Sequence, residues 1–380
     1  MKAARFHGQR DIRIEDVPEP ELRPGAVKIA VAWCGICGTD LHEFLEGPIF
    51  IPSPGHPHPL TGEAAPVTMG HEFSGTVAQL GEGVSGLSVG DSVVVEPYFV
   101  CDECGPCRAG NYNLCTRMGF IGLGGGGGGL SEEIVVDSRW VHPVGSIPLE
   151  EAALIEPLSV AYHAVTRSGL TAGNVAVVGG AGPIGLLTSA VLKGLGITTI
   201  VTELSAARKE KAASSGVADH VIDPSQEDVK ARVLELTAGE GADAAFECAG
   251  VNAVLDSMLD VVRPAGVVVN VSIWGRPATV DMQKVVLKEI DLRGTIAYKG
   301  DHAAAIKLVQ DGKVDLKPFI TGRIALDDLV DKGFDTLINH NDTAVQNTVH
   351  PLGNGPVSRN VRRRHPTGVP PSPCLRCFGR

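Results

Sequence analysis

The sequence has few aromatic residues, a shortage of positive charge and no long apolar run. Phe, Trp and Tyr together make up 4% of the 380 residues, and the net charge is −11. No apolar stretch approaches the roughly 20 residues that cross a bilayer, and the first ten residues lack the order of a secretory signal. Binding to nucleic acid or to an anionic membrane needs a concentrated basic face. We therefore expect neither as a partner, and we predict a soluble, cytoplasmic protein.

Nine cysteines are an odd number for a disulfide framework, and the spacing of four of them indicates metal binding instead. These four form a C-x2-C-x2-C-x7-C pattern at Cys101, Cys104, Cys107 and Cys115. Four thiolates in such a pattern can surround one Zn²⁺ tetrahedrally and leave no open position, which is typical of structural zinc. Thiols that must stay reduced also favour a reducing compartment. We predict a structural zinc lobe over residues 98–118.

The length of the chain and a change in its sequence pattern near residue 158 predict two domains. Residues 1–158 are rich in Gly, Pro and short β-type runs, which predicts an irregular, mostly β catalytic domain. Residues 159–298 alternate apolar strands with helical stretches, which predicts a doubly wound parallel sheet of the Rossmann type. The fold class is therefore α/β, and residues 299–350 are predicted to return to the first domain.

The last segment, residues 351–380, differs in composition from the rest of the chain. It holds six arginines and no acidic residue, so that residues 1–350 carry a charge of −17 without it. Several prolines and the lack of apolar periodicity predict a disordered basic tail. Cys374 and Cys377 form a C-x2-C pair within it, but no second ligand pair is nearby. We interpret them as free thiols.

A glycine-rich motif follows the apolar strand predicted at 175–178 and opens an apolar helix. Its residues are Gly180, Gly182, Pro183, Ile184 and Gly185. The glycines of G-x-G-x-x-G allow a tight turn, the approach of a pyrophosphate and close helix–sheet packing, with the diphosphate at the helix N-terminus. Glu203 ends the next strand, where a carboxylate binds ribose hydroxyls and repels a 2′-phosphate. NAD is therefore favoured over NADP, although Arg208 leaves the choice open.

Two short motifs predict a second metal site. Cys37 lies in C-G-I-C-G-T-D-L-H at 34–42, and His71 lies in G-H-E at 70–72. Together with the cysteine lobe and the glycine motif, they make residues 1–345 resemble the zinc-dependent medium-chain dehydrogenase family. The resemblance implies a GroES-like catalytic domain. It also implies that Cys37, His71 and Glu156 hold a catalytic zinc with one position free, so that each chain carries two zinc ions.

The resemblance also implies a reaction and roles for further residues. Glutamate rather than cysteine at position 156 is similar to the polyol and butanediol branch of the family. It implies hydride transfer between NAD and a vicinal diol, with (2R,3R)-2,3-butanediol and acetoin as the expected pair. The residues expected to act are Thr39 and His42 as a proton relay, Glu72 as a transient zinc ligand, Asp40 as the partner that orients a ligand, and Cys248, Val271 and Ser272 beside the nicotinamide.

Other interpretations stay open. The chain could oxidise a polyol such as sorbitol or xylitol, or it could be a catalytically silent homologue that binds zinc and nucleotide. Apolar loop residues favour the short diol over a long polyol; these are Phe44, Ile49, Phe50 and Ile51. An exposed edge of the Rossmann sheet near 267–273 predicts a homodimer, with a tetramer as the alternative.

One segment departs from the family pattern. The resemblance implies an apolar last strand near residues 344–350, but these residues read A-V-Q-N-T-V-H. Polar residues interrupt the expected apolar run, so we predict a final strand that packs poorly and lowers stability.

Overall fold

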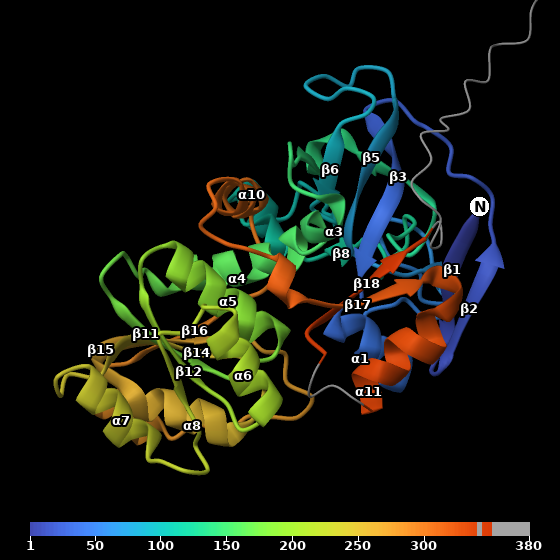
Figure 1. Cartoon of the computed structure of the whole chain (residues 1–380). Coiled ribbons are helices and arrows are strands. Elements are labelled where there is room, and N and C mark those ends of the chain that lie inside the picture. The colour runs from blue at the N-terminus through green and yellow to red at the C-terminus, as the bar shows by residue number, and fades with distance from the viewer. Residues whose placement is uncertain (340–343, 352–380) are drawn as a thin grey trace, which may run out of the picture.

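The structure, a computed structural model, describes residues 1–339 and 344–351 of the chain, which form two parts side by side (Figure 1). The predicted tail at 351–380 lies outside these residues except for Pro351. No helix within the described ranges is both long and apolar enough to cross a membrane.

One part is a six-stranded sheet in which every pair of neighbours is parallel, in the order β13-β12-β11-β14-β15-β16. Its strands are β11 (Val175–Gly179), β12 (Thr198–Thr202), β13 (His220–Ile222), β14 (Ala242–Glu247), β15 (Val262–Asn270) and β16 (Asp291–Gly294). Its helices are α5 (Pro183–Gly194), α6 (Ala206–Ser214), α7 (Val229–Leu236), α8 (Asn252–Val261) and α9 (Met282–Lys288). The strand order reverses between β11 and β14, which is where doubly wound sheets bind dinucleotides. The predicted Rossmann fold is confirmed.

The other part is mostly β-structure, as predicted. Its largest sheet has the order β10-β6-β5-β3-β18-β17, with β9 on β3, beside a small sheet β2-β1-β4 and the hairpin β7-β8. The strands are β1 (Lys2–Gly8), β2 (Asp11–Asp16), β3 (Ala26–Gly35), β4 (Val67–Thr68), β5 (Glu72–Leu80), β6 (Ser92–Val95), β7 (Tyr98–Phe99), β8 (Gly119–Phe120), β9 (Glu133–Asp137), β10 (Val141–Pro143), β17 (Ile320–Ala325) and β18 (Gln346–His350). Strands that precede the Rossmann part in the sequence, such as β3, and strands that follow it, such as β18, therefore share one sheet.

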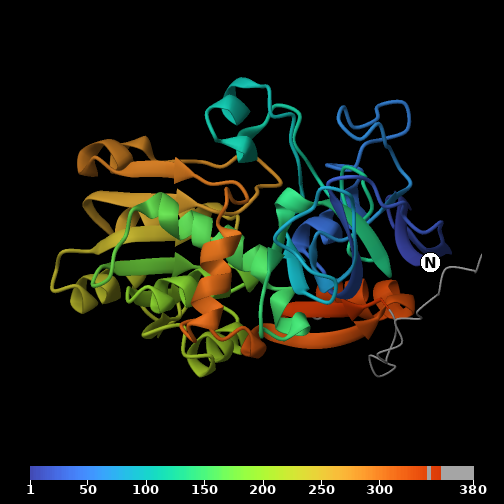
Figure 2. The ribbon, with the colours of Figure 1, turned by 90° about the horizontal axis from the view of Figure 1, so that it is seen from above.

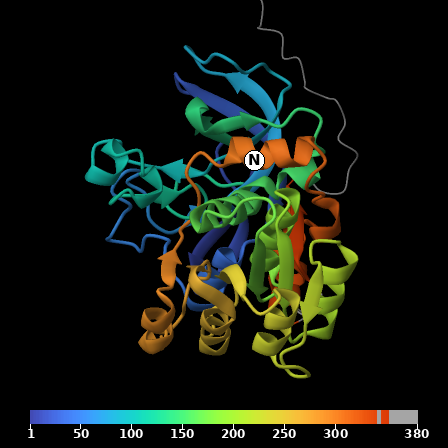
Figure 3. The ribbon, with the colours of Figure 1, turned by 90° about the vertical axis from the view of Figure 1, so that its left-hand side faces the viewer.

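Helices and short turns surround this sheet. The helices are α1 (Gly38–Glu46), α2 (Gly105–Arg108), α3 (Leu149–Ala152), α4 (Ile155–Ser168), α10 (His302–Gln310) and α11 (Asp335–Asn339). The shorter turns are η1 (Tyr112–Leu114), η2 (Ser138–Trp140), η3 (Lys317–Phe319), η4 (Leu326–Asp328) and the π-helical η5 (Leu329–Phe334). Helix α10 crosses the junction of the two parts (Figure 2), and the lobe that carries α2 projects from the body (Figures 2 and 3).

Helix α4 connects the two parts. Ala161, Ala164 and Val165 on this helix pack in one apolar core with residues of α5 and α10. The helix ends at Gly169, whose φ of 77° is the left-handed conformation common after helix C-termini. The domain boundary predicted at residue 158 falls inside this helix, so the chain passes between the two parts without a flexible linker there.

The final strand β18 packs well, and the prediction that it would not is wrong. It runs parallel to β17 and antiparallel to β3, and all five of its residues are buried. Its polar side chains have partners: Gln346 donates to Glu72, and the Thr348 hydroxyl donates to the Gly322 carbonyl at 3.2 Å. Hydrogen bonding therefore replaces the apolar contacts that the family pattern implies.

The edge of the Rossmann sheet also differs from its prediction. Strand β15 lies inside the sheet, between β14 and β16, and residues 271–273 follow it as a loop. The edge strand on this side is β16, whose short D-L-R-G sequence lacks the apolar pattern of a strand, and β13 forms the opposite edge. The prediction of an edge near 267–273 is wrong because this strand was not recognised.

Candidate active site

Four cysteine sulfurs gather in the projecting lobe. One ligand atom from each of Cys101, Cys104, Cys107 and Cys115 lies within 4.8 Å of the others. The Cys101 amide donates to Cys115 Sγ, and the Cys104 amide donates to Cys101 Sγ, each at 3.3 Å. Although burial opposes the shift, hydrogen bonds from Arg117 and Cys104 lower the pKa of Cys101 to about 6. Zinc binds the thiolate form of cysteine, and amide hydrogen bonds stabilise that form. This donor set therefore fits a structural zinc.

A second group of donors lies at the start of two neighbouring elements. Cys37 caps helix α1 just after β3, His71 immediately precedes β5, and Glu72 is the first residue of β5. Their ligand atoms lie within 4.8 Å of one another. Because β3 and β5 are antiparallel neighbours, pairing of Gly35 with Glu72 brings the two motifs together. The structure thus unites Cys37 with His71, and it adds Glu72 to the group.

Glu156, the expected third ligand, lies in the first turn of α4 and is not one of these three. Its carboxylate is close enough to help raise the pKa of Cys37 and that of Glu72. The site therefore has two acidic side chains at hand for one metal position. Which of them binds zinc stays a prediction.

The electrostatics of this cluster call for a cation. Burial, followed by the charges of Asp40 and Glu156, raises the pKa of Cys37 to about 12. Burial also raises the pKa of Glu72 well above its usual range. Burial lowers the pKa of His71, but Asp40, Glu156 and Glu72 outweigh it and leave that pKa raised. Buried thiol and carboxyl groups ionise readily only beside positive charge, and a divalent ion supplies it. The donor set fits zinc.

Asp40 is placed as expected for a residue that orients ligands. It is fully buried, and its Oδ2 accepts the Cys37 amide at 3.0 Å, which closes the first turn of α1. Its Oδ1 lies 3.6 Å from His71 Nδ1. At this distance the carboxylate attracts the ring through its charge, although no hydrogen bond joins the two buried atoms.

The relay residues Thr39 and His42 lie on the same helix as Asp40. Thr39 is half-buried beside Cys37, and His42 is exposed one turn later. Within residues 1–339 and 344–351, no hydrogen bond connects the two side chains. The positions suit a path from the site to solvent, and the relay itself stays a prediction.

Two residues at this site were not predicted. The Tyr298 hydroxyl donates to Glu156 Oε1 at 2.6 Å, and Gln346 Nε2 donates to Glu72 Oε2 at 2.5 Å. The partners are 142 and 274 residues apart along the chain. Motif spacing carries no information on such contacts, and the only signal for Gln346 was the unusual polarity of the last strand.

The loop after α1 is anchored by a buried carboxylate. Glu43 is fully buried and accepts the amides of Ile49, Phe50 and Ile51, which fixes the loop. Of the four apolar residues expected to favour a short diol, Phe44 and Ile51 lie in the core. Ile49 and Phe50, about half exposed, remain available to a ligand.

The glycine motif has the geometry of a dinucleotide turn. Gly180 follows β11 with a φ of 98°, which is strained for any residue with a side chain. A Cβ on Gly185 would collide with the Gly180 carbonyl, whereas one on Gly182 would meet nothing within 4 Å. The open side at Gly182, the N-cap of α5, leaves room for a diphosphate at the helix N-terminus, where Pro183 and Ile184 begin the helix.

Glu203 lies beside this turn, at the end of β12. Its Oε2 accepts the Ala181 amide at 2.8 Å, and its Oε1 accepts the amides of Leu204 and Ser205. Arg208 is in the first turn of α6, where its amide is capped by Ser205 Oγ at 3.4 Å. The carboxylate is thus fixed where an adenosine ribose is expected.

The residues expected beside the nicotinamide lie at the ends of β14 and β15. Glu247, which was not among the predicted residues, organises them: its Oε1 accepts the amides of Ala249 and Gly250, and Ser272 Oγ donates to its Oε2. The Val271 amide donates to the Glu247 carbonyl at 2.9 Å. Cys248 follows directly, and burial raises its thiol pKa. Cys248, Val271 and Ser272 are therefore brought together next to the glycine turn.

Comparisons with known proteins agree with this geometry. Residues 23–146 match the alcohol dehydrogenase GroES-like domain, and residues 183–311 match the zinc-binding dehydrogenase family. The chain is 62% identical over 352 residues to an (R,R)-butanediol dehydrogenase of Neisseria gonorrhoeae, covering 92% of this chain and 99% of the relative. It is also 48% identical over 341 residues to the (R,R)-butanediol dehydrogenase of Bacillus subtilis, and this match covers 89% of this chain and 96% of the relative.

A crystal structure shows the same fold. The 2R,3R-butanediol dehydrogenase from Bacillus subtilis superposes with a TM-score of 0.86 and 47% identity, over 92% of this chain and 99% of that one. Because 92% of this chain is superposed, the match includes both the β-rich part and the Rossmann part. The chain belongs to the zinc-dependent medium-chain dehydrogenases, as its motifs predicted, and is an oxidoreductase of that family.

Proposed function

We propose that the protein interconverts (2R,3R)-2,3-butanediol and acetoin with NAD as the hydride carrier. The carrying observation is the donor group Cys37, His71 and Glu72, with Glu156 beside it. It occurs in a chain 62% identical to a relative of that activity. A glutamate at position 156 in place of a second thiolate supports the diol branch of the family.

The residues of the site would divide the work as follows. Cys37 and His71 hold the metal together with a carboxylate, and Asp40 keeps the His71 ring in one orientation. When bound, zinc would supply Lewis-acid polarisation of the alcohol, and NAD would supply the hydride acceptor. Thr39 takes the hydroxyl proton, and His42, being exposed, passes it to solvent. Ile49 and Phe50 offer apolar contacts to the methyl groups of the substrate.

We further propose two zinc ions per chain and a preference for NAD over NADP. The second zinc is supported by the four sulfurs of the lobe. The NAD preference is supported by Glu203, because a carboxylate fixed by three amides would repel a 2′-phosphate. Reduced thiols at two metal sites suit the cytoplasm.

A homodimer is the proposed assembly, formed along the free edge strand β16. Unpaired edge strands offer backbone groups to a second copy. Large apolar side chains are exposed on and near this edge, with 82% of Leu287, 66% of Val286 and 40% of Leu292 accessible. An isologous interface along β16 would cover these side chains.

The test is NADH formation by the purified protein with (2R,3R)-butanediol, the (2S,3S) isomer and sorbitol offered separately, each with and without a zinc chelator. Selective turnover of the (2R,3R) diol that the chelator abolishes is the expected result. Turnover of sorbitol alone would assign the protein to the polyol enzymes. Zinc and NADH binding without any turnover would identify a silent homologue.

A further inference from the structure

The proposed zinc site has one carboxylate more than it can use. Glu72 and Glu156 are both buried there, beside the buried His71 and the half-buried Cys37. If all four bound zinc, they would fill a tetrahedral site and leave it net negative. A site that activates an alcohol must keep one position open. The protein therefore needs a means to keep carboxylate oxygens away from the metal.

Each carboxylate gives one of its two oxygens to a neutral donor. Tyr298 donates its hydroxyl to Glu156 Oε1 at 2.6 Å, and Gln346 donates its amide to Glu72 Oε2 at 2.5 Å. Tyr298 is 0% exposed and Gln346 is 4% exposed, so water does not compete for these bonds. Hydrogen bonds to a charged acceptor are the strong ones in proteins. In each case one oxygen is occupied and the other is left for the metal or its ligand.

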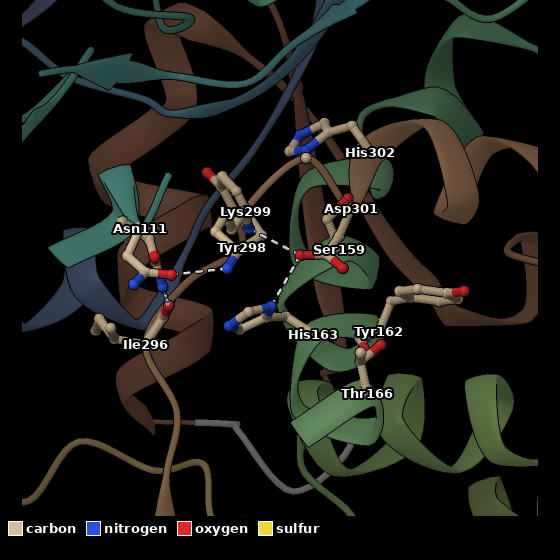
Figure 4. Close-up of polar contacts among 12 residues, drawn as sticks. Asn111, Ser159, Tyr162, His163, Thr166, Ile296, Tyr298, Lys299, Asp301 and His302 are labelled. Atoms are coloured by element: carbon tan, nitrogen blue, oxygen red, sulfur yellow. Dashed lines mark hydrogen bonds and ion pairs between the residues drawn. The ribbon is translucent and has the colours of Figure 1, made fainter. Parts of the chain in front are cut away.

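Tyr298 belongs to the segment 296–301, which makes hydrogen bonds to several other parts of the chain (Figure 4). Its carbonyl accepts the Tyr98 hydroxyl at 2.9 Å. Asp301 Oδ2 accepts the Lys299 amide at 2.7 Å and contacts His163 Nδ1 at 2.9 Å. His163 lies on α4, the helix that carries Glu156, so the segment and the carboxylate are tied to the same helix. Tyr298 is thereby held in place independently of its bond to Glu156.

Lys299 connects the same segment to the cysteine lobe through a hydrogen bond with Asn111. Its Nζ donates to Asn111 Oδ1 at 2.8 Å, and Asn111 Nδ2 donates to the Ile296 carbonyl at 3.2 Å (Figure 4). Gln346 is fixed differently, by its strand: β18 pairs with β3, and Gln346 Nε2 lies 3.4 Å from the Ile36 carbonyl. Both donors are thus rigid, and both follow the Rossmann sheet in the sequence.

We propose that Tyr298 and Gln346 are positioning residues, each of which withholds one carboxylate oxygen from the metal. Tyr298 acts on Glu156, and Gln346 acts on Glu72. Together they keep a coordination position open for the alcohol. This inference rests on the proposed zinc-dependent function and adds the two residues that decide how its carboxylates are used.

The test uses Co²⁺ in place of zinc, because its visible absorption reports coordination geometry without any substrate. The variants are Tyr298→Phe and Gln346→Leu. The control for the first is Thr237→Val, which loses a hydroxyl hydrogen bond of 2.7 Å to the Val233 carbonyl in the Rossmann part, outside both proposed metal sites. The control for the second is Thr348→Val on the same strand. Release of cobalt to a chelator and the KM and kcat for the diol are measured alongside.

In both variants the freed oxygen joins the metal. We expect weaker cobalt absorption bands, as coordination number rises, and slower release to the chelator, because one more protein oxygen must leave before the metal does. KM for the diol rises, since the alcohol must displace an oxygen. The two controls keep the spectrum of the unmodified protein.

Spectra of Tyr298→Phe and Gln346→Leu that coincide with those of the controls, or faster cobalt release, would overturn the inference. If Gln346→Leu does not fold, Gln346→Asn, which keeps the amide but shortens its reach, decides between the same two outcomes. The spectrum needs no turnover, so failure of the unmodified protein to oxidise the diol would reject the proposed substrate alone. Failure to take up cobalt at Cys37 and His71 would reject both proposals.

Discussion

The two proposed metal sites are built in opposite ways. The four sulfurs of the lobe come from a stretch between Cys101 and Cys115, and they accept amide hydrogen bonds from Cys101, Cys104 and Arg117, which lie in or directly after it. The second site combines Cys37 with the His71–Glu72 pair, Glu156, Tyr298 and Gln346, and these six residues lie on five different segments. A site made by one short segment depends on local sequence, and a site assembled from distant segments depends on the whole fold. The difference should appear in what each site does when it is damaged.

The largest difference between the two sites should appear when one proposed zinc ligand of each is substituted. The first such variant is Cys37→Ser. We expect kcat/KM for the diol to fall by about 1000-fold, because a metal contributes several kcal/mol to catalysis and each 1.4 kcal/mol is a factor of ten. One zinc per chain should be lost and the other kept. Metal analysis together with steady-state kinetics checks this. Retention of both zinc ions in the variant would contradict the assignment of Cys37.

Cys104→Ser is the counterpart in the lobe. We expect loss of the other zinc and a free energy of unfolding lower by at least about 4 kcal/mol, since loss of a structural metal is among the largest single-site effects. The protein that remains folded should keep most of its kcat, because no lobe cysteine contacts the substrate. Thermal unfolding and kinetics at a temperature below the transition measure the two effects separately. A loss of kcat as large as in Cys37→Ser would erase the contrast between the sites.

The same contrast explains what could be predicted from the sequence. The cysteine lobe, the glycine turn with Glu203 and the parallel sheet were all readable, because each depends on a regular pattern of neighbouring residues. The contacts of Tyr298 and Gln346 were not readable, since they form only when distant strands and helices meet. Strand β16 was missed for a related reason: its D-L-R-G sequence is held as a strand by pairing with β15 and not by its own apolar pattern.

Strand β18 shows that a strand can also be buried without an apolar pattern. Polar residues that interrupt the expected apolar run predicted poor packing, yet Gln346, Asn347 and Thr348 are all buried. The sequence gives the polarity of a residue, whereas only the fold supplies the acceptors that satisfy it. Thr348, for example, finds a carbonyl of β17, and Gln346 finds a carboxylate of β5.

A smaller effect is expected from Asp40→Asn, which weakens the orientation of His71 while leaving every ligand in place. The amide can still accept the Cys37 backbone hydrogen, but it no longer attracts the imidazole as a carboxylate does. Affinity for the catalytic zinc should fall by about 10- to 100-fold, as is typical for partners of ligands. Competition with a chelator measures it, and the lobe zinc in the same molecule is the internal control. Equal loss from both sites would show that the change acts on the fold and not on His71.

The smallest effect concerns pH and follows from the raised pKa values of the buried cluster. In the metal-free protein, burial raises the pKa of Glu72, and that of Glu156, above their ordinary values near 4.5. The folded state then binds more protons than the unfolded state, so stability is fully present below this ordinary pKa and is lost as pH rises through the raised values. Metal-free protein should therefore melt at a higher temperature near pH 5 than near pH 8. Zinc should abolish most of this slope, because it stabilises the ionised carboxylates. Metal-free Glu72→Gln/Glu156→Gln protein is the matched control: it retains the lobe thiols, so the slope should shrink if the assembled site causes it and persist if the lobe does.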